Sequence, residues 1–467
     1  MVPTPQTSAS EHAHPLSTTH KLAGNPDIQF SVDEMLERIE NKTAVIGVVG
    51  LGYVGLPLAV ELGKAGFRVV GIEINEARAA QCNAGDSYIT DIPDSELRTV
   101  VNTDRLKAHT SFDALKGTDV IVVCVPTNLG DDGNPDLCHV EASSEGIAGI
   151  LEPGQAVILE STSFPGTTVE IAKPILEEKS GLTCAKDFLL AFSPERVDPG
   201  NQEFTVHNTP KVVGASDEAS LDVAVKFYSQ VVGSVVPVSC SRTAEMVKMF
   251  ENAFRAVNIG LVNEMAQLCD HMDLDVWEVL DAAFTKPFGI MPFYPGPGVG
   301  GHCIPVDPVY LAWKAERLGF DSKVVWLAAR TNREMPNWVV GKVERILEKN
   351  GSSMKTGKIV VLGVSYKKDI PDCRESPPIY MIEQMQAMGC NVGFHDPFVD
   401  VIRVNGGVME SEDLQEALTS ADIVVLATDH SCYNMKDIVA KSKHVLDTRG
   451  LTRKFGEIPK CDFAVGL

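Results

Sequence analysis

Short runs of β-branched and other apolar residues alternate with longer mixed segments from Ala44 to about Pro210. The runs are AVIGVVG, RVVGIEI, DVIVVCVPT, AVILEST and FLLAFSPE. Strands that are apolar on both faces and separated by helix-length connections are typical of a parallel sheet covered by helices on both sides. This alternation predicts a doubly wound α/β domain, to which we assign residues 41–239.

The apolar spacing becomes helical after this domain. From Arg242 to about Met272 the chain contains no proline and one glycine, and apolar residues recur at intervals of three and four. This periodicity predicts one continuous helix of about 30 residues. Further helical patterns follow in DVWEVLDAAF and DPVYLAWKAERLGF, so residues 240–350 are expected to form an all-helical middle domain. The recurring residues are Val247, Phe250, Phe254, Val257 and Leu261.

The strand pattern resumes after the polar stretch NGSSMKTG, in KIVVLGVSYK, NVGFHDP, ADIVVLATDH and HVLDTRG. Residues 351–467 are therefore expected to form a second α/β domain. The predicted fold class is α/β, with two Rossmann-like parallel-sheet domains joined by an all-helical middle domain with one long helix. Ligands of such sheets bind at the carboxyl ends of the strands, so we expect a cleft between the two domains.

The N-terminal segment is polar and rich in Pro, Ser, Thr and His, and it lacks the apolar core of a signal peptide. It is interpreted as a disordered leader over residues 1–40. The longest apolar run, Ala44 to Val60, is interrupted by four glycines and a proline. It is therefore read as a strand, a tight turn and a helix rather than as a membrane span.

The formal net charge is −22, which argues against binding to nucleic acid or to anionic membranes. A phosphorylated ligand would need a local positive site in such a protein. The eleven cysteines include no CxxC pair, so neither a metal site nor a disulfide framework is expected. Reduced thiols in a cytoplasmic protein are the simplest account.

A glycine motif follows the first predicted strand. Gly50, Gly52 and Gly55 have the G-x-G-x-x-G spacing, which permits a tight turn, close approach of a pyrophosphate, and close packing of helix and strand. Glu73 ends the second strand 21 residues after Gly52, where a carboxylate accepts hydrogen bonds from ribose hydroxyls and repels a 2′-phosphate. The motif predicts NAD rather than NADP, with Arg78 near the adenosine.

Polar residues on the predicted long helix share one face, because Lys248, Asn252 and Arg255 are spaced by four and three. A solvated polar stripe is the usual explanation, but this stripe suits an oxygen-rich or anionic ligand. Cys303 and Asp307, also four apart, lie in the Gly- and Pro-rich stretch PGPGVGGHCIPVDP. If a helix begins there, its N-terminus would favour the Cys303 thiolate. A surface loop with an inert cysteine is the alternative.

Three further candidates follow predicted strands. Thr127 and Thr162 end two strands where hydroxyls could contact the cofactor, although threonine is common in strands for other reasons. Glu195 lies in FSPERVDPGN, which could equally be a helix-capping turn. His302 is not assigned as a base.

A thiolate beside a nicotinamide has a chemical use, because an aldehyde is a poor hydride donor until a thiol adds to it. The resulting hemithioacetal is oxidised to a thioester, which water hydrolyses. Lysine and asparagine would stabilise the oxyanion, and a carboxylate would orient the water.

These motifs resemble those of the nucleotide-sugar 6-dehydrogenases, which include UDP-glucose, GDP-mannose and UDP-N-acetylhexosamine dehydrogenases. The resemblance runs from about Ala44 to Gly450 through GLGYVGLPLA, CVPT, ESTSFPGTT, FSPERVDPGN, AEMVKMFENAFRAVNIGLVNE, FYPGPGVGGHCIPVDP and GVSYKKDIPDCRESP. It implies four-electron oxidation of a sugar C6 alcohol to a carboxylate with two NAD, and a homodimer formed through the long helix.

The resemblance also implies roles for single residues. Cys303 would be the nucleophile, Lys248 and Asn252 would stabilise the alkoxide and oxyanion, and Glu195 and Asp307 would assist proton transfer and water activation. The implied NAD contacts are Tyr53, Val54, Glu73, Arg78, Thr127, Thr162 and Arg374, and the implied substrate contacts are Arg196, Val197, Lys248, Asn252, Arg255, Gly300, Tyr366 and Lys367.

UDP-glucose enzymes have an acidic residue where this chain has Pro199. Together with KPFGIMPFYPGPG, this difference makes the chain most similar to UDP-N-acetylglucosamine 6-dehydrogenases. UDP-N-acetylmannosamine, UDP-N-acetylgalactosamine and UDP-glucose remain alternative substrates. A two-electron β-hydroxyacid dehydrogenase and a non-catalytic NAD-binding scaffold are more remote alternatives.

Overall fold

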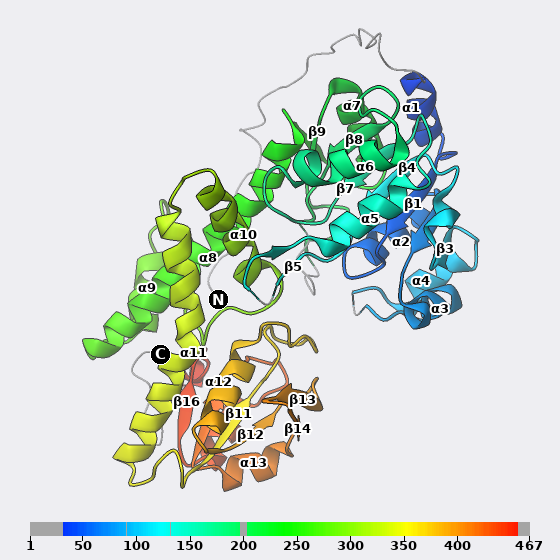
Figure 1. Ribbon diagram of the computed structural model, residues 1–467. Helices are drawn as coiled ribbons and strands as arrows, with labels where there is room; N and C mark the ends of the chain where they lie inside the picture. The colour runs from blue at the N-terminus through cyan, green and yellow to red at the C-terminus, as the bar shows by residue number, and fades with distance from the viewer. Residues whose placement is uncertain (1–30, 90, 131, 197–202, 456–467) are drawn as a thin grey trace.

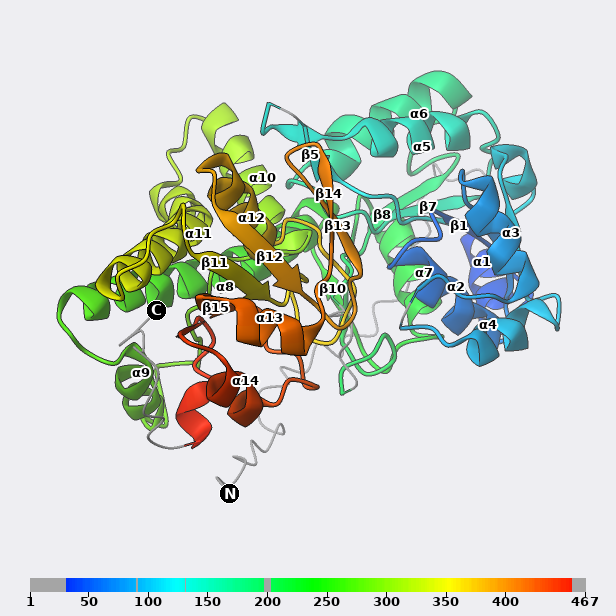
Figure 2. The ribbon, with the colours of Figure 1, turned by 90° about the horizontal axis from the view of Figure 1, so that it is seen from below.

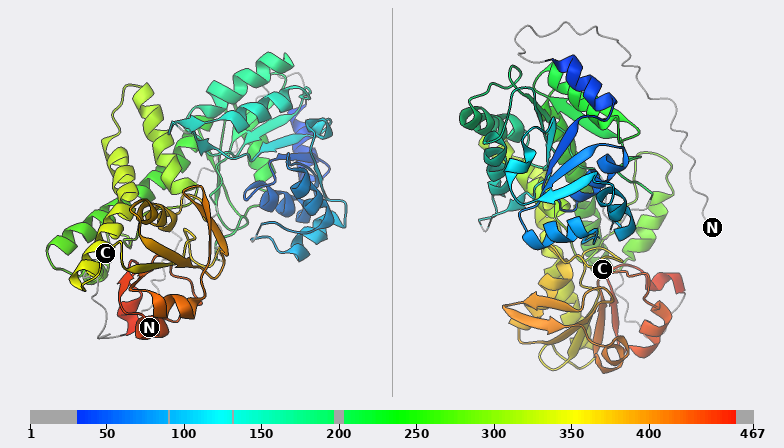
Figure 3. Two further views of the ribbon diagram at one scale, coloured as in Figure 1. Left: turned by 60° about the horizontal axis from the view of Figure 1, so that its bottom comes forward. Right: turned by 90° about the vertical axis from the view of Figure 1, so that its right-hand side faces the viewer.

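The computed structural model describes residues 31–89, 91–130, 132–196 and 203–455. Two lobes, each built around its own sheet, are joined by long helices (Figure 1). Viewed from the side, the first sheet lies above the second, with the helices of the middle part between and behind them (Figure 3, right). No helix of the described residues is long and apolar enough to cross a membrane.

The first lobe contains an eight-stranded sheet, counted over the described residues, with the order β10-β9-β8-β7-β4-β1-β2-β3. Its strands pair in parallel from β3 to β8. The pairing of β9 with β8 is antiparallel, and β10 is parallel to β9. The bounds are β1 Val45–Val49, β2 Arg68–Ile72, β3 Leu106–His109, β4 Val120–Val123, β7 Ala156–Leu159, β8 Leu189–Phe192, β9 Lys211–Ala215 and β10 Val235–Val238.

Helices cover both faces of this sheet (Figure 2). One face packs against the apolar sides of α1, α2, α4 and α7, and the other against those of α5 and α6. A fully buried strand has no polar face, which explains the uninterrupted apolar runs of the sequence. The helices are α1 Val32–Glu40, α2 Gly55–Lys64, α3 Glu76–Ala84, α4 Asp94–Val101, α5 Cys138–Ala148, α6 Lys173–Ser180 and α7 Glu218–Tyr228.

The predicted disordered leader is wrong in its last ten residues. Ser31 accepts a hydrogen bond from the Glu34 amide and caps α1, and Met35 and Ile39 are buried in the first core. Arg38 also pairs with Asp119 across 2.6 Å. These contacts stabilise a helix that is too short to stand alone. Residues 1–30 lie outside the described residues.

The middle of the chain is helical, as its periodicity predicts. The long helix α8, Ser241–His271, has 31 residues. It is followed by α9 Val276–Phe284, α10 Cys303–Arg317 and α11 Lys323–Lys349. The N-terminal part of α8 packs on the first sheet through Ala244, whereas Val262 and Ala266 near its other end belong to the core of the second lobe.

The second lobe is a four-stranded parallel sheet with the order β12-β11-β15-β16 in the described part of the chain. A short antiparallel pair, β13 with β14, lies beside it and was not predicted. The bounds are β11 Lys358–Leu362, α12 Pro377–Ala387, β12 Asn391–His395, β13 Val401–Val404, β14 Gly407–Glu410, α13 Leu414–Ser420, β15 Ile423–Leu426, α14 Met435–Lys441 and β16 Val445–Asp447.

Candidate active site

The glycine-rich turn joins β1 to α2 in a shape that only glycine permits at two positions. Gly50 has φ +88°, and a Cβ there would lie 2.7 Å from the Cys124 carbonyl oxygen. A Cβ on Gly55 would overlap the Gly50 carbonyl oxygen. A Cβ on Gly52, by contrast, would meet nothing within 4 Å. The turn that leads into α2 is therefore open on the side of Gly52, which suits a pyrophosphate.

The end of β2 lies beside this turn, because the Gly50 amide donates to the Ile72 carbonyl at 2.8 Å. The next residue, Glu73, is buried, and its Oε1 accepts from the Asn75 amide at 2.9 Å. Arg78 extends its guanidinium over the Tyr88 ring at 5.6 Å. The structure thus brings the predicted ribose and adenosine contacts to the same side as the glycines.

The two predicted strand-end threonines lie against each other. The Thr127 hydroxyl donates to the Thr162 carbonyl at 2.6 Å. Across the cleft, the Arg374 guanidinium of the second lobe lies 5.0 Å from the Tyr53 ring centre. Arg374 also pairs with Asp372 across 2.6 Å. The neighbouring Tyr53 is 45% exposed. Residues of both lobes therefore border the open space over the glycine turn.

Cys303 is the first residue of α10, so the predicted helix start is confirmed. Asp307 lies one turn further and accepts a hydrogen bond from Asn252 Nδ2 of α8 at 2.5 Å. Lys248, Asn252 and Asp307 are all buried. Burial raises the pKa of Asp307 to about 6, although Lys248 and the Asn252 hydrogen bond lower it. The helices α8 and α10 thus place a thiol, an amide, an ammonium and a carboxyl at one point.

The expectation that the helix start favours the thiolate is contradicted. Burial and the nearby Asp307 raise the pKa of Cys303 above its usual value, and the positive charges of Lys248, Arg374 and Arg255 offset this only in part. Cys303 as a whole residue is exposed, whereas its thiol group is largely surrounded by protein. A proton must therefore leave the sulfur when it reacts at neutral pH.

The loop before Cys303 packs tightly on the second lobe. A Cβ on Gly300 would lie 2.6 Å from Tyr366 Cβ and 2.7 Å from the Glu375 carbonyl oxygen. Gly301 has φ +83° and lies against the Tyr366 ring, and its amide donates to the Arg374 carbonyl at 2.9 Å. These glycines bring the Cys303 helix into contact with the predicted nucleotide-binding residue Tyr366.

Gly300→Ala is expected to destabilise the protein by about 1–3 kcal/mol, because the added methyl overlaps backbone and Cβ atoms that cannot move independently. Thermal unfolding measures the change. Gly341→Ala is the matched control, since a Cβ there meets nothing and alanine favours the α11 helix. Equal melting temperatures for Gly300→Ala and the wild type would contradict the packing described.

Glu195 and Arg196 follow β8, and Arg196 contacts α8. Arg196 Nη2 pairs with Glu251 of α8 across 2.6 Å, and its Nη1 donates to the Pro210 carbonyl at 2.7 Å. Glu251 is the residue before Asn252, so this turn borders the Lys248–Asn252 stretch. Val197 lies outside the described residues.

The remaining predicted substrate residues are set on separate elements. Arg255 is exposed on α8, one turn beyond Asn252. Lys367 belongs to the loop after β11, which Asp396 holds by accepting from the Val364 and Ser365 amides at 2.7 and 3.1 Å. The structure brings this loop to Gly301 through Tyr366.

Several positioning residues were missed in the sequence. Asn263 of α8 accepts from the Gly296 amide at 3.0 Å and donates to Asn332 of α11 at 2.9 Å, which fixes the start of the glycine- and proline-rich loop. Glu245 accepts from the amides of Gly166 and Thr168 and fixes the loop after β7. Asn263 continues the spacing of the α8 polar face, since it lies eleven residues after Asn252, and that signal could have found it.

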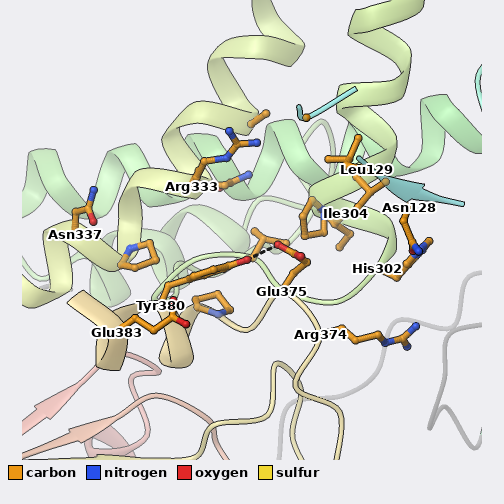
Figure 4. A pocket seen from close by; sticks show the side chains of 18 of the residues that line it. Asn128, Leu129, His302, Ile304, Arg333, Asn337, Arg374, Glu375, Tyr380 and Glu383 are labelled. Atoms are coloured by element: carbon orange, nitrogen blue, oxygen red, sulfur yellow. Dashed lines mark hydrogen bonds between the residues drawn. The ribbon is translucent and has the colours of Figure 1, made fainter. Parts of the chain in front are cut away.

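An open pocket of about 900 Å³ borders the first turn of α10 (Figure 4). His302 and Asn128 lie on one side of it, joined by a hydrogen bond of 2.9 Å, and Tyr380, bonded to Glu375, lies on the other. Its lining contains His302, Ile304 and Arg374 but not Cys303, Lys248 or Asn252. The pocket therefore lies next to Cys303 in the chain, but it is a different space from the one that Cys303, Lys248 and Asn252 border.

Three family models match the chain. They are described as the NAD binding domain, the central domain and the UDP binding domain of the UDP-glucose/GDP-mannose dehydrogenase family. They match residues 44–232, 242–334 and 360–454.

Individual proteins are similar over most of their length. Protein CapL of Staphylococcus aureus is 36% identical over 413 residues, covering 87% of this chain and 96% of that protein. UDP-N-acetyl-D-glucosamine 6-dehydrogenase of Salmonella typhi is 32% identical over 409 residues, covering 86% and 94%. The solved structure of the UDP-D-ManNAc dehydrogenase from Pyrococcus horikoshii has a TM-score of 0.82 and 33% identity, and it covers 90% of this chain and 98% of that one.

Proposed function

Because the chain belongs to the UDP-glucose/GDP-mannose dehydrogenase family, we propose that it oxidises the C6 hydroxyl of a UDP-N-acetylhexosamine to a carboxylate. It is an NAD-dependent oxidoreductase that acts on a UDP-sugar. We propose UDP-N-acetylglucosamine as the substrate. The observation that carries the reaction is the convergence of Cys303, Asp307, Lys248 and Asn252 between the lobes.

The open space beside Gly52, the α2 N-terminus and buried Glu73 fit a dinucleotide. NAD held there would supply the hydride acceptor for both oxidations. Lys248 and Asn252 stabilise the negative charge that develops on the sugar C6 oxygen. The Cys303 sulfur adds to the intermediate aldehyde, and the thioester formed after the second oxidation is hydrolysed by water.

Two carboxyl groups move the protons of this sequence. Asp307, with a pKa of about 6, is suited to accept a proton at neutral pH and return it. Glu195 takes the proton of the attacking water. Arg196, Val197, Arg255, Gly300, Tyr366 and Lys367 form the substrate site, and Tyr53, Val54, Arg78, Thr127, Thr162 and Arg374 contact the cofactor. The proposed boundaries of the three domains are 41–239, 240–350 and 351–467.

The preference for an N-acetylhexosamine rests on Pro199 and the segment KPFGIMPFYPGPG. Pro199 lies outside the described residues. The relatives named for UDP-N-acetyl sugars support this substrate class. UDP-N-acetylmannosamine, UDP-N-acetylgalactosamine and UDP-glucose are the competing substrates.

We also propose a homodimer that forms through α8. Phe250 is 64% exposed, Leu261 56% and Leu268 48% on this helix. Phe254 and Met246 add to the same exposed apolar set. A second copy would remove this surface from water, which is favourable in proportion to the area covered.

Glu73→Ala is expected to weaken NAD binding by about 10–100-fold, because hydrogen bonds to a charged acceptor contribute about 1.5–3 kcal/mol. It is also expected to reduce the discrimination against NADP, since the repelling carboxylate is removed. Titrations of both nucleotides measure this. Glu73→Gln is the control, because its amide oxygen still accepts from Asn75. An unchanged preference for NAD in Glu73→Ala would refute the ribose contact.

The proposed function is tested with purified protein, NAD and a panel of UDP-N-acetylglucosamine, UDP-N-acetylgalactosamine, UDP-N-acetylmannosamine, UDP-glucose and GDP-mannose. Two NADH per sugar consumed support the thioester route, and one would support a simple two-electron dehydrogenase. No NADH with any of these sugars would support a non-catalytic scaffold. The sugar with the highest kcat/KM identifies the substrate.

A further inference from the structure

A buried ion-pair cluster lies in the first lobe, where β7 and β8 end and β9 begins. Lys211 Nζ donates to Glu160 Oε2 and to Glu195 Oε2, each at 2.9 Å. The Tyr228 hydroxyl donates to the other oxygen of Glu160, and the Tyr228 ring lies 5.1 Å from Lys211 Nζ. The side chains of Glu160 and Lys211 are 0% and 6% exposed, whereas that of Glu195 is 17% exposed. Glu195 is therefore the most exposed member of the cluster.

The antiparallel pairing of β8 with β9 creates this arrangement. In the observed register, Ala191 faces Ala215 and Phe192 faces Gly214. Continuing the register places Glu195, three residues beyond β8, opposite Lys211, the first residue of β9. A strand parallel to β8 would have put its first residue at the other edge of the sheet, away from the ligand side.

The Glu195 carboxylate is held at both oxygens. Oε1 accepts from the Arg196 amide at 2.9 Å, and Oε2 accepts from Lys211. The Arg196 side chain ties the same turn to Pro210 and to Glu251 of α8. Buried ion pairs are seldom needed for stability, because apolar residues of similar volume serve as well. A cluster that leaves one carboxylate partly exposed, next to the proposed substrate residue Arg196, has a use that packing alone lacks.

We propose that Lys211 is a positioning residue that orients the Glu195 carboxylate for hydrolysis of the Cys303 thioester, and that Glu160 holds Lys211 in place. This inference rests on the proposed function. In the step concerned, the water oxygen bonds to the thioester carbonyl carbon while one water proton passes to Glu195. The carbon–sulfur bond then breaks, which releases the Cys303 thiolate and the uronic acid.

The test variant is Lys211→Met combined with Glu160→Gln. The double change avoids leaving Glu160 as a buried unpaired charge, and the amide oxygen of the substituted glutamine can still accept from Tyr228. Lys211→Arg keeps the cation. Lys342→Met with Asp270→Asn is the matched control, because it removes another largely buried lysine–carboxylate pair, between α11 and α8.

We expect the double variant to give a burst of NADH followed by turnover slowed at least about 100-fold, the usual minimum for loss of a general base. Intact-protein mass spectrometry should then show a sugar nucleotide bound to Cys303. Lys211→Arg should restore hydrolysis to within about tenfold of the wild type. The Lys342 control should accumulate no adduct.

A folded double variant that hydrolyses at the wild-type rate would overturn the assignment. A double variant that loses the NADH burst and forms no adduct would also overturn the assignment, since that result indicates a general structural role for Lys211. Wild-type protein that forms no NADH with any sugar of the panel overturns the proposed function itself, and the wild-type measurement therefore separates the two failures.

Discussion

Cys303→Ala is expected to lower uronic acid formation by at least about 1000-fold, because the proposed second oxidation proceeds through a thioester of the Cys303 sulfur. NAD binding should stay nearly intact, since Cys303 begins α10, whereas the glycine turn precedes α2 of the first lobe. Mass spectrometry of the sugar products and a nucleotide titration measure the two properties.

Two further variants sharpen this test. Cys303→Ser should also fail to give acid, because a hydroxyl is a far weaker nucleophile than a thiolate at neutral pH. Cys432→Ala is the matched control, since Cys432 is an exposed cysteine of the second lobe. Normal carboxylate production by either Cys303 variant would refute the mechanism.

Asp307→Asn is expected to change activity and stability in opposite directions. Activity should fall about 100-fold or more, because the amide cannot exchange protons with the reacting groups. Stability should rise at neutral pH. The pKa of Asp307 is about 6 in the folded protein, whereas aspartate in an unfolded chain titrates near about 3.9. The folded state thus binds this proton more tightly, and ionisation destabilises it as the pH rises from about 4 to 6.

The pH dependence identifies the cause. Above pH 7 the difference of about two units between the folded and unfolded pKa of Asp307 lowers the unfolding free energy by at most about 3 kcal/mol. The asparagine variant has no carboxyl group to ionise, so it does not lose this stability. Its gain in unfolding free energy should therefore be largest at pH 8 and should disappear toward pH 4. Denaturant titrations at several pH values measure it. Asp437→Asn removes an exposed carboxylate of α14 as a control. A gain that is equal at pH 4 and pH 8 would contradict the burial effect.

Local patterns predicted the elements that carry most of the candidate site. The three-and-four spacing predicted α8, and that helix places Lys248 and Asn252 on one face. The strand–glycine–helix order predicted the turn at Gly50 to Gly55. These features depend on residues close together in sequence, so periodicity and turn chemistry are sufficient to find them.

Features that depend on tertiary contacts were missed. The run KVVGA is equally compatible with either strand direction, so the reversal of β9 and the pairing of Lys211 with Glu195 could not be read from it. The helix α1 has only nine residues, so its apolar pattern is too short to be distinguished from the polar segment that precedes it. The pKa of Cys303 depends on burial and on Asp307, and the helix position alone suggested the opposite direction.

The helix α8 also constrains how the length of the chain can change. Asn252 of this helix donates to Asp307, one turn after Cys303, and Asn263 holds the loop that precedes Cys303. Each residue of a helix adds about 1.5 Å and about 100° of rotation. Deleting one residue between these asparagines would turn one anchor away from its partner. Insertions and deletions that diversify such enzymes are therefore expected in the loops that flank α8. The number of residues in α8 itself should stay constant.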